Sequence, residues 1–222
     1  MSTPEQESVT ERGNPRKPEG EYGRQMLTRM NESHAAVTEW GLSFLDLHAD
    51  HRVLDIGCGG GAALRRMAQT VTAGHLTGAD YSPVSVETAK AFNADAIAAQ
   101  RMEIIEASVE ALPFPDRSFD RIITVESFYF WPSPAENLAE VRRVLRPDGR
   151  FLLIADIYDS GSLPESDLEN IRKYQLFNPT PERFRALFQE AGFPDIRVHL
   201  SENGKPWICV EARNEKGKEP SS

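Results

Sequence analysis

The stretch Val53-Leu54-Asp55-Ile56-Gly57-Cys58-Gly59-Gly60-Gly61-Ala62 joins a short apolar run to a cluster of glycines. Residues 52–56 have the composition of a buried strand, and residues 62–71 show the apolar spacing of a helix. Glycines are needed between two such elements where the backbone turns sharply and a ligand comes close to it. This stretch therefore predicts a strand, a ligand-binding loop and a helix in succession.

The alternation of strand and helix continues on both sides of this unit. Further strands are predicted at residues 75–80, 102–107, 119–125 and 150–157, and two closing strands at 196–200 and 207–212 flank a turn at 202–204. Helices are predicted at residues 22–47 (with a break near Gly41), at 82–99 after a cap at Ser82, from 134 onward after a capping box at Ser133, at 165–177, and at 181–191 after a cap at Thr180. A turn is predicted at 147–149. This alternation predicts an α/β fold with a seven-stranded, mostly parallel sheet, helices on both faces and a C-terminal antiparallel hairpin at one edge.

Length and composition indicate one globular domain. The chain has 222 residues, of which 40% are hydrophobic and 27% charged. We expect a disordered N-terminal arm at residues 1–20, one domain at 21–212 that begins with a helical cap at 21–47, and a disordered tail at 213–222, because both ends are too polar to bury apolar surface.

Net charge and cysteine content limit the expected binding partners and the expected cellular compartment. The formal net charge of −9 disfavours a nucleic-acid partner. No apolar run approaches the roughly 20 residues of a membrane span, so no membrane partner is expected. Cys58 and Cys209 lie far apart and suggest neither a disulfide framework nor a metal site. We expect a cytoplasmic protein that is a monomer or a homodimer and holds no metal.

Two cofactors are compatible with the glycine loop. Gly57, Gly59 and Ala62 satisfy the fingerprint of dinucleotide-binding loops, which indicates a nicotinamide or flavin enzyme. Asp55 favours another ligand, because a carboxylate beside the loop would oppose a pyrophosphate but suits the ammonium and sulfonium groups of S-adenosylmethionine. Asp80 ends the second strand and can accept hydrogen bonds from a ribose, which both cofactors carry. Alternatively, Asp80 serves only as a cap for the helix that follows.

Four motifs in register resemble a known family. These are Asp55-x-Gly57-x-Gly59-x-Gly61, Asp80 after the second strand, Glu110-Ala111-Leu112-Pro113-Phe114 followed by Ser118-Phe119-Asp120, and Leu145-Arg146-Pro147-Asp148-Gly149-Arg150. Together they are similar to those of the class I S-adenosylmethionine-dependent methyltransferases, and within them to the methyltransferase type 11 group that acts on small molecules. The resemblance covers residues 50–155 and implies a Rossmann-like fold with S-adenosyl-L-methionine as cofactor.

The resemblance also implies which residues bind the methionine part of the cofactor. Gly57 and Gly59, with Gly61 in the same motif, would line it. Asp55 would order the loop or reach the amino group through water. Glu126, just past the fourth strand, would offer its backbone carbonyl to that amino group.

Five other residues would bind the adenosine part. The resemblance implies that Asp80 holds the ribose, that Tyr81 packs on the adenine face, and that Ser108, Val109 and Glu110 lie beside the adenine edge. Relatives commonly have an aspartate where this chain has Ser108. A serine hydroxyl can accept the same hydrogen bond, but without charge assistance.

The sequence identifies no catalytic residue, because the sulfonium of S-adenosylmethionine is already a good leaving group and positioning alone can supply about 7–11 kcal/mol. Tyr129 and Trp131, after the fourth strand, are candidates to contact the acceptor or to serve only as core. Asn31 and His34 share one face of the first predicted helix and could bind a carboxylate or take a proton. Asp156 and Tyr158 are weaker candidates, by position alone.

A small-molecule acceptor is favoured because the segment after the fourth strand lacks the Asn/Asp-Pro-Pro-aromatic and Pro-Cys sequences typical of DNA methyltransferases. Two alternatives remain. A non-catalytic S-adenosylmethionine-binding module would have the same cofactor motifs. A nicotinamide-dependent reductase is disfavoured by Asp55 and by the lack of a Tyr-x-x-x-Lys pair.

Overall fold

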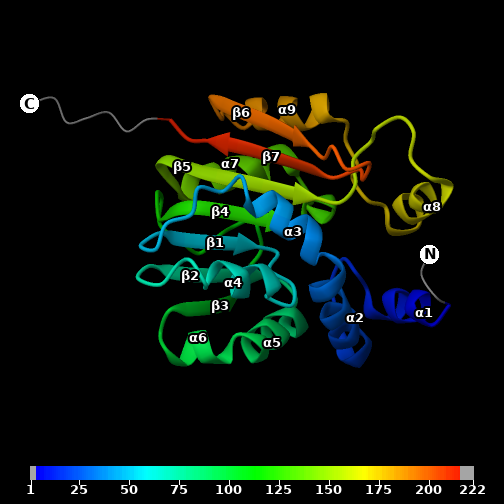
Figure 1. Ribbon diagram of the computed structural model, residues 1–222, viewed down its shortest axis with the longest axis horizontal. Helices are drawn as coiled ribbons and strands as arrows, with labels where there is room; N and C mark the ends of the chain where they lie inside the picture. The colour runs from blue at the N-terminus through cyan, green and yellow to red at the C-terminus, as the bar shows by residue number, and fades with distance from the viewer. Residues whose placement is uncertain (1–3, 216–222) are drawn as a thin grey trace, which may run out of the picture.

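The computed structural model describes residues 4–215 and contains one seven-stranded sheet (Figure 1). Its strands are β1 (Arg52–Ile56), β2 (His75–Asp80), β3 (Met102–Glu106), β4 (Phe119–Val125), β5 (Leu145–Ala155), β6 (Asp195–Leu200) and β7 (Ile208–Arg213). They lie in the order β3-β2-β1-β4-β5-β7-β6, and β7 alone in this sheet runs opposite to the other six strands. The predicted fold class is confirmed, including the closing hairpin at one edge.

Helices cover both faces of the sheet. They are α1 (Pro4–Gly13), α2 (Gly20–Ser33), α3 (Ala35–Leu42), α4 (Ala62–Met67), α5 (Pro83–Phe92), α6 (Ala94–Ala98), α7 (Pro134–Val144), α8 (Glu165–Tyr174) and α9 (Pro181–Glu190), with a 3₁₀ turn η1 (Phe128–Phe130). Side chains of β5 alternate between the two faces: Phe151 and Leu153 pack with α7 and α9, whereas Leu152 and Ile154 pack with α3, α4 and α5. The buried strands are therefore apolar on both faces, as expected for a covered parallel sheet.

Two predicted helices are interrupted at positions other than those expected. The helix predicted at 22–47 breaks at His34 and not near Gly41. Gly41 lies inside α3, where an added Cβ would be 2.5 Å from the Ile154 side chain, so this glycine permits close packing on β5. The helix predicted at 82–99 breaks at Asn93, whose buried amide donates hydrogen bonds to the carbonyls of Gly61 and Ala89.

The N-terminal arm differs from the expectation of disorder at residues 1–20. Residues 4–13 form α1, which packs on α2, and residues 1–3 lie outside the described range. The helices approach closely because Gly13 has no side chain: a Cβ there would be 2.9 Å from the carbonyl oxygen of Tyr22. Farther along, the carbonyl of Pro18 accepts a hydrogen bond from Ser82 Oγ at 2.6 Å. Contacts of this kind, which a polar composition does not reveal, hold the segment on the domain.

Smaller differences concern the second half of the chain. The turn predicted at 147–149 lies within β5, where a register shift against β4 accommodates it. The capping box at Ser133 is replaced by the Asn137 side chain, which accepts a hydrogen bond from the backbone N–H of Ser133 at 3.1 Å. Arg213, the first residue of the tail predicted at 213–222, instead ends β7, and residues 216–222 lie outside the described range. Between residues 4 and 215, no helix combines the length and apolar character needed to cross a bilayer.

Candidate active site

A cavity of about 820 Å³ opens at the carboxyl ends of the parallel strands. Gly57 after β1, Asp80 at the end of β2, Glu126 after β4 and Asp156 after β5 all line it. Figure 1 shows α1, α2 and α8 beyond the ends of these strands, and residues of all three contribute to the lining. The cavity thus occupies the place where ligands bind in open α/β sheets, and its size is that of a small-molecule site.

The glycine loop lines the middle of the cavity. The backbone N–H groups of Gly57 and Cys58 both donate to the carbonyl of Ala79, at 2.7 and 3.2 Å, which ties the loop to β2. Gly57 and Gly59 have φ of 70° and 51°, in the left-handed region that favours glycine. An added Cβ at Gly57 would lie 2.4 Å from Ser127 Oγ, so the loop is also packed closely against the segment after β4.

Asp55 presents an unpaired buried oxygen. The residue is 1% exposed, and its Oδ1 has no hydrogen-bond partner among the described residues. Burial, with a smaller contribution from the charge of Asp80, raises the pKa of Asp55 to about 8. A buried polar atom without a partner costs about 1–3 kcal/mol, a cost that a ligand with an N–H group or a positive charge would remove.

Both carboxylate oxygens of Asp80 have a hydrogen-bond partner, unlike those of Asp55. Its carboxylate accepts hydrogen bonds from the backbone N–H groups of Gly59 and Ser82, both at 2.9 Å. Burial raises the pKa of Asp80, and these hydrogen bonds oppose the shift. Asp80 therefore orders the glycine loop and the turn before α5, whose N-cap is Ser82 and not Asp80, and it also lines the cavity where a ribose is expected.

The residues expected at the adenine lie together on the cavity wall: Tyr81, Ser108, Val109 and Glu110. The Ser108 hydroxyl donates to the Glu110 carboxylate at 3.1 Å and accepts from the Glu110 backbone N–H at 3.2 Å. Its donor is thus occupied and an acceptor lone pair remains, which suits an adenine amino group. Tyr81 donates a hydrogen bond to the carbonyl of Arg16, so the N-terminal segment reaches this end of the cavity.

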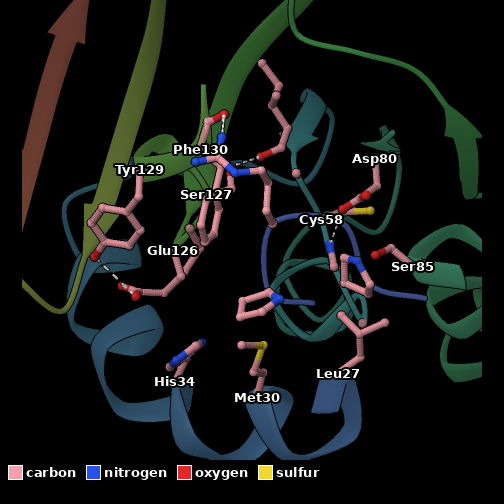
Figure 2. A pocket seen from close by; sticks show the side chains of 18 of the residues that line it. Leu27, Met30, His34, Cys58, Asp80, Ser85, Glu126, Ser127, Tyr129 and Phe130 are labelled. Atoms are coloured by element: carbon pink, nitrogen blue, oxygen red, sulfur yellow. Dashed lines mark hydrogen bonds between the residues drawn. The ribbon is translucent and has the colours of Figure 1, made fainter. Parts of the chain in front are cut away.

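The opposite end of the cavity is acidic. Glu126 accepts a hydrogen bond from the Tyr129 hydroxyl at 3.2 Å (Figure 2). It accepts another from the backbone N–H of Asp156. Burial, and then the charge of Asp156, raises the pKa of Glu126 well above its ordinary value. His34 lies beside this pair: one ligating atom from each of His34, Glu126 and Asp156 falls within 4.8 Å of the other two.

The acceptor candidates occupy different places in the structure. His34 and Tyr129 join the acidic end, and Trp131 lines the cavity while its indole N–H donates to Ser127 Oγ at 3.3 Å. Asn31 also lines it, but its amide donates to the Gly60 carbonyl at 3.1 Å and so holds the glycine loop. Tyr158 packs against the hydrophobic core and is not among the cavity residues.

Gly61 likewise lies outside the lining, contrary to its predicted place in the cofactor site. An added Cβ there would meet the Asn93 amide at 2.5 Å and Ala89 at 3.0 Å, so this glycine lets α4 approach α5. Its φ of 80° begins α4 in the left-handed region. The third glycine of the motif is therefore explained by helix packing.

Several lining residues were not predicted to contact a ligand. Arg16 lies beside the ring of Phe130 and donates to the Phe130 carbonyl at 3.4 Å. Leu27 and Met30 on α2 were predicted only as helical residues, yet both face the cavity (Figure 2). Their apolar character on a mostly polar helix was the available signal. Asp156 was a weaker candidate by position, and its contacts with Glu126 give it a central place.

Comparisons with known proteins agree with this geometry. A family model described as a methyltransferase domain matches residues 54–153. The chain is 33% identical over 162 residues to a chloroplastic 2-methyl-6-phytyl-1,4-hydroquinone methyltransferase of Arabidopsis thaliana, covering 72% of this chain but only 44% of that enzyme. It is 32% identical over 198 residues to the 27-O-demethylrifamycin SV methyltransferase of Amycolatopsis mediterranei, covering 84% of this chain and 70% of the other.

Solved structures share the fold. A S-adenosylmethionine-dependent methyltransferase from Aquifex aeolicus superimposes with a TM-score of 0.67 at 20% identity, over 86% of this chain and 97% of that one. The chain spans less than half the length of the chloroplastic enzyme, so the whole length of that relative is not represented here.

Proposed function

Because the chain belongs to the class I S-adenosylmethionine-dependent methyltransferases, a family whose cofactor is S-adenosylmethionine, we propose that it transfers a methyl group to a small-molecule acceptor held in the same cavity. The observation that carries the proposal is the continuity of the cavity. The lining continues from the residues expected at the adenosine, past the glycine loop, to the acidic end, where residues of α2 meet those that follow β4 and β5.

The residues present fit the cofactor. The unpaired Oδ1 of Asp55 suits an ammonium group, and Asp80 retains acceptor capacity for ribose hydroxyls. The left-handed Gly57 and Gly59 leave open backbone where side chains would crowd a ligand. When bound, S-adenosylmethionine supplies an activated methyl group on a good leaving group. The chain's part is then to bind, to orient the acceptor and to exclude water.

The side chains around the acidic end of the cavity are suited to a small acceptor. Apolar and aromatic side chains surround it, among them Met30, Tyr129, Phe130, Trp131 and Ile157. A site of this kind holds an acceptor atom in line with the methyl carbon, a contribution of about 7–11 kcal/mol to lowering the barrier. The names of two relatives specify a hydroquinone and a rifamycin. The net charge of −9 disfavours nucleic acid.

Calorimetric titration with S-adenosylmethionine, S-adenosylhomocysteine and NAD, each alone, tests the cofactor site. We expect micromolar binding of the first two and loss of that binding in Asp80→Ala and Gly57→Val. Gly204→Val is the matched control, because Gly204 also has a positive φ, 77°, but lies in open space far along the chain in the closing hairpin.

Turnover is then measured as transfer of an isotopically labelled methyl group to a panel of small hydroxylated and amino acceptors. Binding of NAD alone would instead support the alternative that the glycine loop binds a dinucleotide. Cofactor binding with no transfer to any acceptor would favour the non-catalytic binding module.

A further inference from the structure

The acidic end of the cavity combines a histidine with two carboxyl groups from distant parts of the chain. His34 comes from the junction of α2 and α3, Glu126 from the end of β4 and Asp156 from the end of β5. Their ligating atoms lie within 4.8 Å of one another, and no hydrogen bond joins the His34 ring to either carboxyl group among the described residues. This spacing leaves room for one polar group that contacts all three.

The charge and the lining together define what this end can accept. The charge of Asp156, beside the buried Glu126 carboxyl group, disfavours an acceptor that carries a carboxylate or phosphate near the reacting atom. The wall is apolar and aromatic, with Met30 from α2, Phe130 from η1 and Leu176 after α8. An uncharged, largely apolar molecule that presents one hydrogen-bond donor is therefore complementary to the acidic end.

We propose that this end of the cavity binds a neutral aromatic or otherwise apolar acceptor through a hydroxyl group, and that His34 takes the hydroxyl proton as the methyl group is transferred. The inference rests on the proposed function and names its acceptor class and its base.

Atoms and charge balance in this step. The O–H bond of the acceptor breaks and its proton moves to a ring nitrogen of His34, while the same oxygen forms its bond to the methyl carbon. The carbon–sulfur bond breaks and its electron pair stays on sulfur, so the positive charge passes from the sulfonium to the imidazole. Asp156, within 4.8 Å of the ring, stabilises the imidazolium that forms.

The groups that face His34 are consistent with a neutral ring before the reaction. Burial lowers the pKa of His34, the charge of Asp156 opposes this shift, and the charge of Arg29 adds to it. Arg29 lies on α2 and donates a hydrogen bond to Thr10 of α1. The other facing groups are Glu126 and Tyr129, which are hydrogen-bonded to each other. A neutral imidazole is a competent proton acceptor near pH 7.

The acceptor class is tested with two coumarins that differ in one charged group. The complex of the full chain with S-adenosylhomocysteine is titrated with 7-hydroxy-4-methylcoumarin and with 7-hydroxycoumarin-4-acetate. We expect the acetate to bind at least about tenfold more weakly. Equal or tighter binding of the acetate would overturn the proposed acceptor class.

The base is tested with His34→Gln, which preserves size and hydrogen bonding but cannot take the proton. We expect unchanged affinity for S-adenosylhomocysteine, and methyl transfer to the coumarin about 10²–10⁴-fold slower at pH 7, recovering as pH rises and the free coumarin ionises. The absorbance of bound coumarin should change to that of its anion at lower pH in the unaltered chain than in the variant. His48→Gln is the matched control, since His48 is exposed and precedes β1 at the other end of the sheet.

Three results separate the inference from the proposed function. If His34→Gln keeps the rate, its pH profile and the absorbance change, His34 is not the base. If a chelator abolishes transfer and Mg²⁺ restores it, the cluster is a metal centre and the inference is overturned. If the unaltered chain does not bind S-adenosylhomocysteine, the proposed function itself fails, and the inference fails with it.

Discussion

Asp55→Asn should make the free protein more stable at neutral and alkaline pH. The carboxyl group is buried with one unpaired oxygen, and its pKa is about 8 in the folded chain against an ordinary value of 3.8. The folded state therefore holds this proton more tightly than the unfolded state does. Below pH 4 both states are protonated and Asp55 adds no pH-dependent cost. As pH rises, the unfolded state releases the proton first, and stability falls until pH 8.

The magnitude follows from the distance between the two pKa values. At pH 7 the unfolded carboxyl group is about three pH units above its pKa, which corresponds to about 4 kcal/mol, and the cost levels off near 6 kcal/mol above pH 8. These are upper values, because water and small shifts of the chain reduce the penalty. The asparagine side chain is neutral at every pH and removes the ionisation cost.

Urea denaturation of both proteins between pH 5 and 8 measures this effect. We expect the gain in the free energy of unfolding to grow with pH by up to about 1.4 kcal/mol per unit. Affinity for S-adenosylmethionine should fall, because asparagine cannot ionise in response to the bound ammonium group. Asp95→Asn, at an exposed position on α6, should show no such trend. A gain that is the same at every pH would refute the argument that ionisation of a buried group is its cause.

Three other substitutions test the loop and the core. Gly57→Ala should lower the free energy of unfolding by more than the roughly 1–2 kcal/mol expected for a left-handed alanine, because its Cβ would lie 2.4 Å from Ser127 Oγ. Gly204→Ala is the control: Gly204 has φ of 77° but lies in open space, so in the same thermal melt we expect only the backbone penalty. Asn31→Ala should weaken cofactor binding severalfold in calorimetry while the melting temperature changes little, since the lost hydrogen bond holds only the glycine loop. Phe151→Ala, at a fully buried ring, should cost about 3–5 kcal/mol in urea titrations, and a loss below 1 kcal/mol would contradict the assigned core.

The fold could be predicted because its evidence is local. The apolar runs of the strands, the glycine loop and the Ser82 and Thr180 caps each depend on residues close in sequence, and the structure bears them out: both hydroxyls accept a hydrogen bond from the N–H three residues later. The N-terminal helix α1 could not be predicted in this way, because a short polar helix is stable only through packing on a partner. The break at His34 escaped prediction for a related reason, since no glycine or proline marks it.

The candidate site was predictable in its cofactor half and not in its acceptor half. Asp55, Asp80 and the glycines occupy one continuous strand–loop–helix region and the strand next to it, so their spacing reveals them. His34 and Asp156 meet only because the helix before β1 crosses the carboxyl end of β5, a contact that no sequence spacing records. Tyr158 shows the converse error: a residue close to the site along the chain packs into the core once the strand has ended at Ala155.

The acidic end also explains an unfavourable backbone conformation. Glu126 has φ of 54°, a left-handed conformation that costs a side chain other than glycine roughly 1–2 kcal/mol. In this conformation its backbone N–H donates to the Ile154 carbonyl, while its carboxyl group accepts from the N–H of Asp156. The ends of β4 and β5 are thus joined where the two carboxyl groups face His34. Backbone strain therefore persists beside buried groups whose pKa values are shifted. This combination is typical of functional sites, where the fold positions chemical groups for a ligand at some cost in stability.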